Sequence, residues 1–189
     1  MKHHRQLWKT TKEHGKRRQN SGKPLLIASL LVGLLALPLG TAQATTITVD
    51  GNCTLPNAII AANTNTISGG CPAGEGNETD TIVLNEDVTL TFIDDTVDIA
   101  NYGPNGLPVV TSDIIIEGNG HIIQRGTSPL CPGYDLLSDF RIFVVTSDAD
   151  LTLQDTTVRY GCSAFGGGIN NGGALTLIDT TITDSTVVF

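Results

Sequence analysis

Apolar and polar residues alternate in two nearly identical stretches near the end of the chain, LTLQDTTV at 151–158 and LTLIDTTI at 175–182. In each stretch, two leucines alternate with a threonine before an aspartate ends the run. A period of two is typical of a half-buried β-strand. An earlier stretch, DIIIEGNGHII at 113–123, has the same order of Asp, apolar pair and turn. The chain therefore repeats one short strand-and-turn unit.

Short strands separated by turns rich in Gly, Asn and Asp predict a solenoid, in which equivalent positions stack on one another. We expect Leu151 to lie over the level of Ile114, and Leu175 over Leu151, with strands about 4.8 Å apart. A β-sandwich with two similar Thr-rich strands is the alternative. The segment SAFGGGINNGG, 163–173, joins the two copies. Because neither a Lys nor a helix follows it, we interpret it as a structural turn and not as a phosphate-binding loop.

The segment TLPNAIIAAN, 54–63, predicts a short helix near the start of this strand-rich region. Helical periodicity places Leu55, Ile59 and Ala62 on one face, and Thr54 is suited to the N-cap position. The end of a solenoid exposes an open strand edge, which promotes aggregation unless it is covered. We therefore expect the apolar face of this helix to cover that end of the stack.

The first 44 residues predict a secretory signal peptide. They contain eight of the 11 Lys and Arg residues, followed by the apolar run PLLIASLLVGLLALPLG and the small residues Ala42 and Ala44. Cleavage is expected after Ala44, and an uncleaved anchor is the alternative. No transmembrane segment is expected after cleavage. We therefore expect a secreted or cell-surface protein.

Residues 45–189 are strongly acidic. Three arginines and no lysine stand against 18 Asp and Glu, which gives a formal charge of −15. Such a surface repels nucleic acid and anionic lipid, so neither is expected as a partner.

Four cysteines in an exported chain predict two disulfides. Three connectivities are possible. We rank the most local pairing first, which joins Cys53 to Cys71 and Cys131 to Cys162.

Two segments resemble known bacterial surface proteins. GGGINNGGALTLIDTTITDST, 166–186, resembles the coils of right-handed parallel β-helix proteins related to the polymorphic outer-membrane protein repeats. NCTLPNAIIAANTNTISGGCPAGEGNETDTIVL, 52–84, resembles the CSLREA-type N-terminal segment that precedes such helices. It departs from that segment at Pro56-Asn57, where the family usually has Arg-Glu.

The resemblance implies an all-β fold, a right-handed parallel β-helix with a short N-terminal α-helical cap. We expect a signal peptide at 1–44, a CSLREA-like cap at 45–85 and β-helix coils at 86–189. Because the sequence stops at TITDSTVVF in mid-coil, we expect the coils to be incomplete at the C-terminus.

Parallel β-helices host many polysaccharide lyases and hydrolases, so a catalytic site is one hypothesis. Such sites need carboxylates that converge, or a cationic base beside them. The candidates are Asp94, Asp95, Asp98, His121 and Arg125. Consecutive strand residues face opposite ways, so the first two would not converge on a strand. His121 is better explained as an ordinary residue between a turn and a strand.

Calcium is a second hypothesis, because several aspartates are expected to lie close together. The candidate ligands are Asp148 and Asp150, with the stacked pair Asp155 and Asp179. Ca²⁺ takes six to eight oxygen ligands, some of which turn carbonyls can supply. Exposure of these side chains at turns is the alternative.

The sequence thus favours an exported or cell-surface scaffold with an adhesin-like use and no catalytic site. Surface glycans or other cell-surface components are its expected partners. A polysaccharide-active lyase or hydrolase is the alternative.

Overall fold

A computed structural model describes residues 44–76, 78–94, 102–126, 131 and 139–188. The predicted signal peptide up to residue 43, and the candidates Asp95 and Asp98, lie outside these residues. The described part consists mostly of short strands, with one helix among its regular elements. These elements are β1 (Thr46–Val49), α1 (Leu55–Thr64), β2 (Asp80–Leu84), β3 (Val88–Leu90), β4 (Ile114–Glu117), β5 (Ile122–Arg125), β6 (Phe143–Val145), β7 (Asp150–Gln154), β8 (Thr157–Arg159), β9 (Cys162–Ser163), β10 (Ile169–Asn171), β11 (Ala174–Ile178), β12 (Thr181–Thr183) and β13 (Thr186–Val187).

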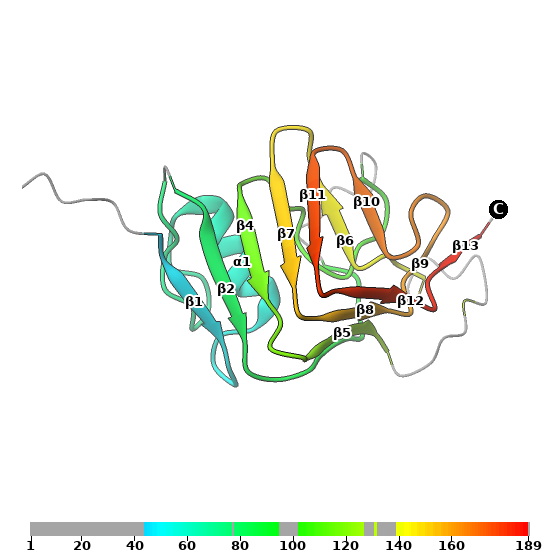
Figure 1. The fold of residues 1–189 in the computed structure, drawn as a ribbon, viewed down its shortest axis with the longest axis horizontal. Helices are drawn as coiled ribbons and strands as arrows, with labels where there is room; N and C mark the ends of the chain where they lie inside the picture. Colours follow the sequence, from blue (N-terminus) through cyan, green and yellow to red (C-terminus); the bar gives the residue numbers. More distant parts are fainter. Residues whose placement is uncertain (1–43, 77, 95–101, 127–130, 132–138, 189) are drawn as a thin grey trace, which may run out of the picture. The chain divides into compact units, whose positions relative to one another are not determined.

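The strands form parallel sheets. In the largest sheet, β1, β2, β4, β7 and β11 lie side by side in this order (Figure 1). A second sheet has the order β12, β8, β5, β3, and two smaller sheets pair β6 with β10 and β9 with β13. All of these pairs are parallel. Parallel neighbours cannot be joined by a hairpin, so the chain leaves each sheet and returns to it for the next strand.

The strand register confirms the stacking predicted from the repeat. Leu151 pairs with Leu175 on one side and with Ile114 on the other. The strands β7 and β11 are offset by 24 residues, whereas Thr46 of β1 pairs with Thr81 of β2. A longer connection, which contains α1, separates this earlier pair. Among the described strand pairs, the 24-residue offset therefore occurs only where the connection between neighbouring strands is short.

An internal column of apolar side chains runs across the largest sheet. Ile47, Ile82, Ile116 and Leu153 pair in succession and are each 0% exposed. Leu177 follows Leu153 in the same column but is 44% exposed. The difference arises because Leu153 is covered by a strand on both sides, whereas no described strand covers the outer side of β11. Burial in this fold thus depends on the neighbouring strand.

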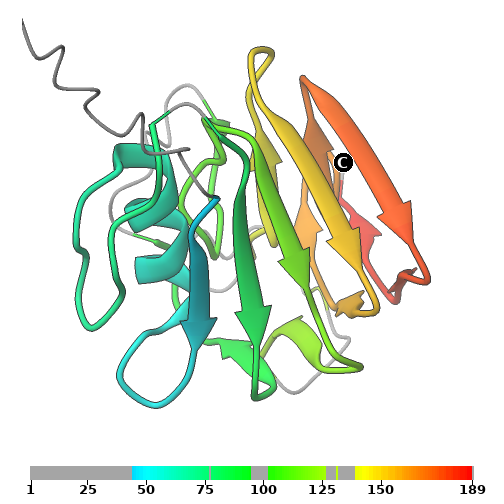
Figure 2. The ribbon, with the colours of Figure 1, turned by 60° about the vertical axis from the view of Figure 1, so that its left-hand side comes forward.

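The helix α1 begins where the sequence predicts. The Thr54 hydroxyl accepts a hydrogen bond from the Asn57 backbone N–H at 3.4 Å, and Asn65 ends the helix in a left-handed conformation with φ of 54°. Its buried face contains the three predicted residues together with two more alanines: Leu55, Ala58, Ile59, Ala61 and Ala62. It packs against β1 and β2, at the β1 end of the sheet (Figure 2). Within the described residues, no helix is long and apolar enough to cross a membrane.

Two disulfides join Cys53 to Cys71 and Cys131 to Cys162, which is the pairing ranked first from the sequence. The first disulfide brackets α1 and ties the residue before the helix to the loop after it. The second ties Cys131 to Cys162 of β9.

The glycine-rich connection between β9 and β10 has a structural role. A Cβ atom on Gly167 would overlap the carbonyl oxygen of Thr186, and Gly166 has φ of 63°. Only glycine allows both the close backbone approach and the positive φ without strain. The structure thus gives glycine a steric reason at these two positions.

We expect Leu153→Ala to lower the free energy of unfolding by about 2–4 kcal/mol, because it leaves a cavity in a filled column. Leu177→Ala is the matched control, since it removes the same atoms from a partly exposed position and should cost less than about half as much. Urea unfolding midpoints of the two variants and the wild type measure both effects. Equal losses would contradict the burial described for this column.

Candidate functional site

A row of polar side chains crosses three strands on the outer face of the second sheet. Thr89 of β3, Gln124 of β5 and Arg159 of β8 occupy matching register positions. The Gln124 Nε2 donates a hydrogen bond to Thr89 Oγ1 at 3.0 Å, and Arg159 Nε donates to Gln124 Oε1 at 2.8 Å. Each side chain thus orients the next. We refer to these three residues as the polar row.

Tyr160 extends this site beside the polar row. The guanidinium carbon of Arg159 lies 4.7 Å from the centroid of the Tyr160 ring, within the range of a cation–π contact. The backbone of Tyr160 has φ of 66°, which is unfavourable for a bulky residue. From the interior, Arg125 Nε donates a hydrogen bond to the Tyr160 carbonyl at 2.7 Å. This bond helps to hold the left-handed backbone in place.

A carboxylate–imidazole pair lies on the same sheet, where the chain enters β5. His121 Nδ1 lies 3.1 Å from Asp87 Oδ1, and the Ile122 N–H donates to the same oxygen at 3.0 Å. The pKa of Asp87 is lowered, first by the hydrogen bond from Ile122 and then by the one from His121. The charges of His121 and Arg159 lower it further. Asp87 is therefore an ionised carboxylate at neutral pH, which can orient the imidazole.

The structure separates the cationic candidates predicted for catalysis. His121 pairs with Asp87 at the surface, with 32% of its side chain exposed. Arg125 is only 8% exposed, and its guanidinium lies 6.0 Å from the Phe140 ring centroid. Burial lowers the pKa of Arg125, and the charge of Asp139 opposes this shift. Arg125 thus supports the backbone from inside and does not share a solvent-facing site with His121.

Of the three acidic candidates for catalysis, only Asp94 lies among the described residues. The Asp94 backbone N–H donates to the Asn105 carbonyl at 2.8 Å, which fixes this segment beside the next one. Asp95 and Asp98 lie outside the described residues.

The four candidate calcium ligands lie at two different places. Asp148 and Asp150 are at the start of β7, whereas Asp155 and Asp179 follow the ends of β7 and β11. The five residues of β7 separate the two pairs by about 16 Å. Asp155 and Asp179 both have φ of 48°. Asp tolerates this left-handed conformation better than most residues, which gives the stacked pair a turn-forming role.

An acidic pocket surrounds Asp148. Its volume is about 360 Å³, and it is lined by Asn65, Glu75, Gly76, Glu78, Thr79, Ser112, Asp113 and Asp148. Carboxylate and hydroxyl oxygens are the ligand types that Ca²⁺ prefers, so these are the residues that could hold a cation. One oxygen of Asp113 already accepts a hydrogen bond from the Asp150 N–H at 3.0 Å. Glu75 and Glu78 were not among the candidates predicted from the sequence. They are distant from Asp148 along the chain, and folding places all three at the same pocket.

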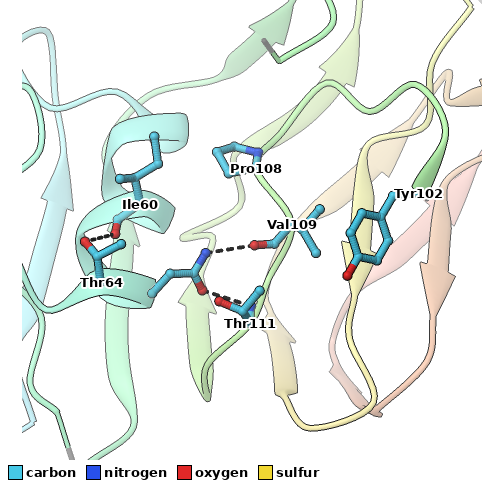
Figure 3. A pocket seen from close by; sticks show the side chains of 7 residues that line it. Ile60, Thr64, Tyr102, Pro108, Val109 and Thr111 are labelled. Carbon is cyan, nitrogen blue, oxygen red and sulfur yellow. Dashed lines mark hydrogen bonds between the residues drawn. The ribbon is translucent and has the colours of Figure 1, made fainter. Parts of the chain in front are cut away.

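A second pocket of about 380 Å³ lies between α1 and the segment before β4 (Figure 3). Asn63 connects the two walls, since its amide donates to the Val109 carbonyl at 2.8 Å and accepts from the Thr111 N–H at 2.9 Å. The lining carries no charged side chain, and Tyr102 supplies its aromatic ring. Because the Asn63 amide is engaged within the protein, its main role here is to fasten α1.

The three arginines that the structure describes differ sharply in their surroundings. Arg141 is 2% exposed and donates hydrogen bonds of 2.7 Å to the Tyr102 carbonyl and to Ser163 Oγ. Burial lowers its pKa. Arg125 is also buried, whereas Arg159 is half-buried and faces outward. Among the three arginines that the structure describes, only Arg159 therefore presents its charge to solvent.

Sequence reasoning did not single out Gln124, Arg159 or Tyr160. A signal was present, because Thr89, Gln124 and Arg159 follow one another at intervals of 35 residues. That interval is longer than the 24-residue repeat and connects residues of three different types, so it does not stand out as a pattern.

Comparison with known proteins identified no relative of this chain. No family model, no curated protein and no solved structure matches this chain.

Asp87→Asn removes the charge of the carboxylate–imidazole pair but keeps an oxygen for the Ile122 N–H. The folded pKa of Asp87 lies below its unfolded value of about 3.9, so its contribution is complete above that pH and is lost as the pH falls through the folded pKa. We expect the variant to be less stable than the wild type by about 0.5 kcal/mol at pH 7, and this difference to shrink near pH 2–3. Urea unfolding at both pH values measures it.

Glu86→Gln serves as the control, because it removes a neighbouring charge that makes no hydrogen bond with the described residues. A difference between wild type and Asp87→Asn that stayed constant from pH 7 to pH 2 would contradict the role given to this pair.

Proposed function

We propose that this chain is an exported or cell-surface β-helical scaffold with an adhesin-like use. The observation that carries the proposal is the polar row, in which hydrogen bonds connect outward side chains of three successive parallel strands. A face of this kind is rigid, because each side chain is fixed by its neighbour and each strand by the next. Rigid, repeated surfaces of stacked strands suit binding to extended partners. Surface glycans are the partners that we propose.

The proposed architecture is a right-handed parallel β-helix with an N-terminal cap of the CSLREA type at 45–85. Successive strands of the largest sheet are parallel, and a strand of another sheet follows each of β2, β4, β7 and β11 along the chain. Crossover connections between parallel strands are right-handed in about 98% of cases. The packing of α1 against β1 and β2 supports its role as the cap.

Export is supported by three independent features. The basic lead and apolar run at 1–44 have the order of a secretory signal peptide. The two disulfides persist best in an oxidising compartment. Residues 45–189 have a formal charge of −15, which keeps an exported protein soluble outside the cell.

A polysaccharide-active enzyme is the second candidate, and the His121–Asp87 pair favours it. Asp87 orients the imidazole through Nδ1, which leaves Nε2 as the atom that could accept a proton. Arg159 lies close enough for its charge to lower the pKa of Asp87. A base and a cation on one face are the elements that a lyase acting on uronates requires.

We expect a bacterial host that produces the whole chain to export it and to remove residues 1–44. N-terminal sequencing of the exported protein should then begin at Thr45, and non-reducing peptide mapping should find both disulfides. Ala44→Arg, which blocks the expected cleavage position, is the matched control and should retain the leader. Wild-type protein that stays in the cytoplasm and retains Trp8 would contradict the proposed export.

Incubation of the exported protein with acidic polysaccharides, with and without calcium, separates the two candidate functions. The scaffold predicts that no unsaturated products form; such products are detected by their ultraviolet absorbance. Formation of such products by the wild type but not by His121→Ala would establish the enzyme and overturn the scaffold. Glu86→Gln, at a neighbouring exposed position, controls for unspecific effects of substitution on this face.

A further inference from the structure

Arg159 differs from the other two arginines in what its guanidinium is free to bind. Its Nε is engaged by Gln124, and among the described residues neither Nη atom makes a hydrogen bond. The planar guanidinium is held on one side by Gln124 and on its face by the Tyr160 ring. The two free nitrogens therefore form a fixed fork, the geometry that binds the two oxygens of a carboxylate.

The backbone of Tyr160 gives independent support for a binding role. The pairing of Arg159 with Thr183 and of Cys162 with Thr186 places Tyr160 level with Asp184 in the next strand segment. Asp184 has φ of 50° and Tyr160 has φ of 66°. Asp adopts this conformation readily, whereas a tyrosine there is strained by about 1–2 kcal/mol. The strained tyrosine places its ring against Arg159, which an aspartate could not do.

The surroundings of the fork restrict the ligand. The formal charge of −15 on residues 45–189 repels densely charged polyanions. In the polar row, Arg159 is followed by the neutral amide of Gln124 and then by the Thr89 hydroxyl, which match the hydroxyl groups of a sugar. The charge of the nearby Asp87 carboxylate, which interacts with that of Arg159, disfavours a ligand with several carboxylates. A ligand with one carboxylate among many hydroxyls therefore fits better than a polyuronate or an acidic peptide.

The geometry points to Arg159 as the centre of a recognition site for a single uronic acid unit in an otherwise neutral glycan. Arg159 binds the carboxylate through both Nη atoms, Gln124 and Tyr160 hold the guanidinium in place, and Thr89 orients Gln124. This site deepens the proposed function, on which it rests, because it supplies the ligand class of the scaffold.

The test is isothermal titration of the exported protein with three probes of similar size. The first is a trisaccharide with one terminal glucuronic acid, the second has glucose in its place, and the third is an acetylated tripeptide with one glutamate. We expect the acidic trisaccharide to bind at least tenfold more tightly than either of the others. Equal binding of the acidic and neutral trisaccharides, or tighter binding of the peptide, would overturn the assignment.

Two variants locate the site. Arg159→Lys keeps the charge but not the fork, and we expect at least a tenfold loss of affinity for the acidic trisaccharide. Tyr160→Asp introduces the residue type found at the equivalent position 184, so it should raise or preserve the unfolding midpoint while it weakens binding. A merely structural tyrosine would instead lower stability and binding together. Unchanged affinity in Arg159→Lys would refute the site.

Failure of the uronic acid site and failure of the proposed function would give different experimental results. An exported protein that binds none of the probes refutes the uronic acid site and leaves the scaffold standing. A protein that is retained in the cytoplasm but binds the acidic trisaccharide through Arg159 refutes the surface function and supports the site.

Discussion

The stacking of like side chains in register between neighbouring parallel strands is the constraint on which the rest of this structure depends. Leu153 of β7 is buried between strands on both sides, whereas Leu177 of β11, which has a described strand on one side only, is 44% exposed. Each strand therefore contributes to the stability of its neighbours more than to its own. The parallel register that stacks the inward side chains also aligns the outward ones. It therefore determines both the packing of the core and the arrangement of the polar row.

The two ends of the largest sheet differ in what packs against them. At the β1 end, α1 buries five apolar residues against the first strands, and the disulfide between Cys53 and Cys71 holds its flanks together. At the β11 end, apolar side chains that follow the internal columns are partly exposed, among them Leu177 at 44% and Ile182 at 39%. The apolar face of α1 thus packs against the first two strands at one end of the sheet.

The sequence was informative where the chain is locally regular. The strands at 151–154 and 175–178 were predicted from their alternation, and α1 from Thr54 and the spacing of its apolar residues. The polar row was not predicted, because Gln124 and Arg159 meet only after a connection of 35 residues returns the chain to the same sheet. Arg125 was expected at a surface site but lies inside, because its parity along β5 matches that of the buried Ile123. The residue type alone therefore suggested a catalytic arginine. The alternation of side chains along β5, however, places the Arg125 side chain on the buried face of the sheet.

The central claim is the parallel register of β7 and β11, which spin labels on cysteine substitutions can test. Labels on Gln154→Cys and Ile178→Cys should lie about 5 Å apart and show strong spin exchange, because these residues are register partners. Labels on Gln154→Cys and Ala174→Cys should lie about 13 Å or more apart and show none. An antiparallel hairpin between the two strands would reverse the result, with exchange for the 154 and 174 pair alone, and would contradict the account.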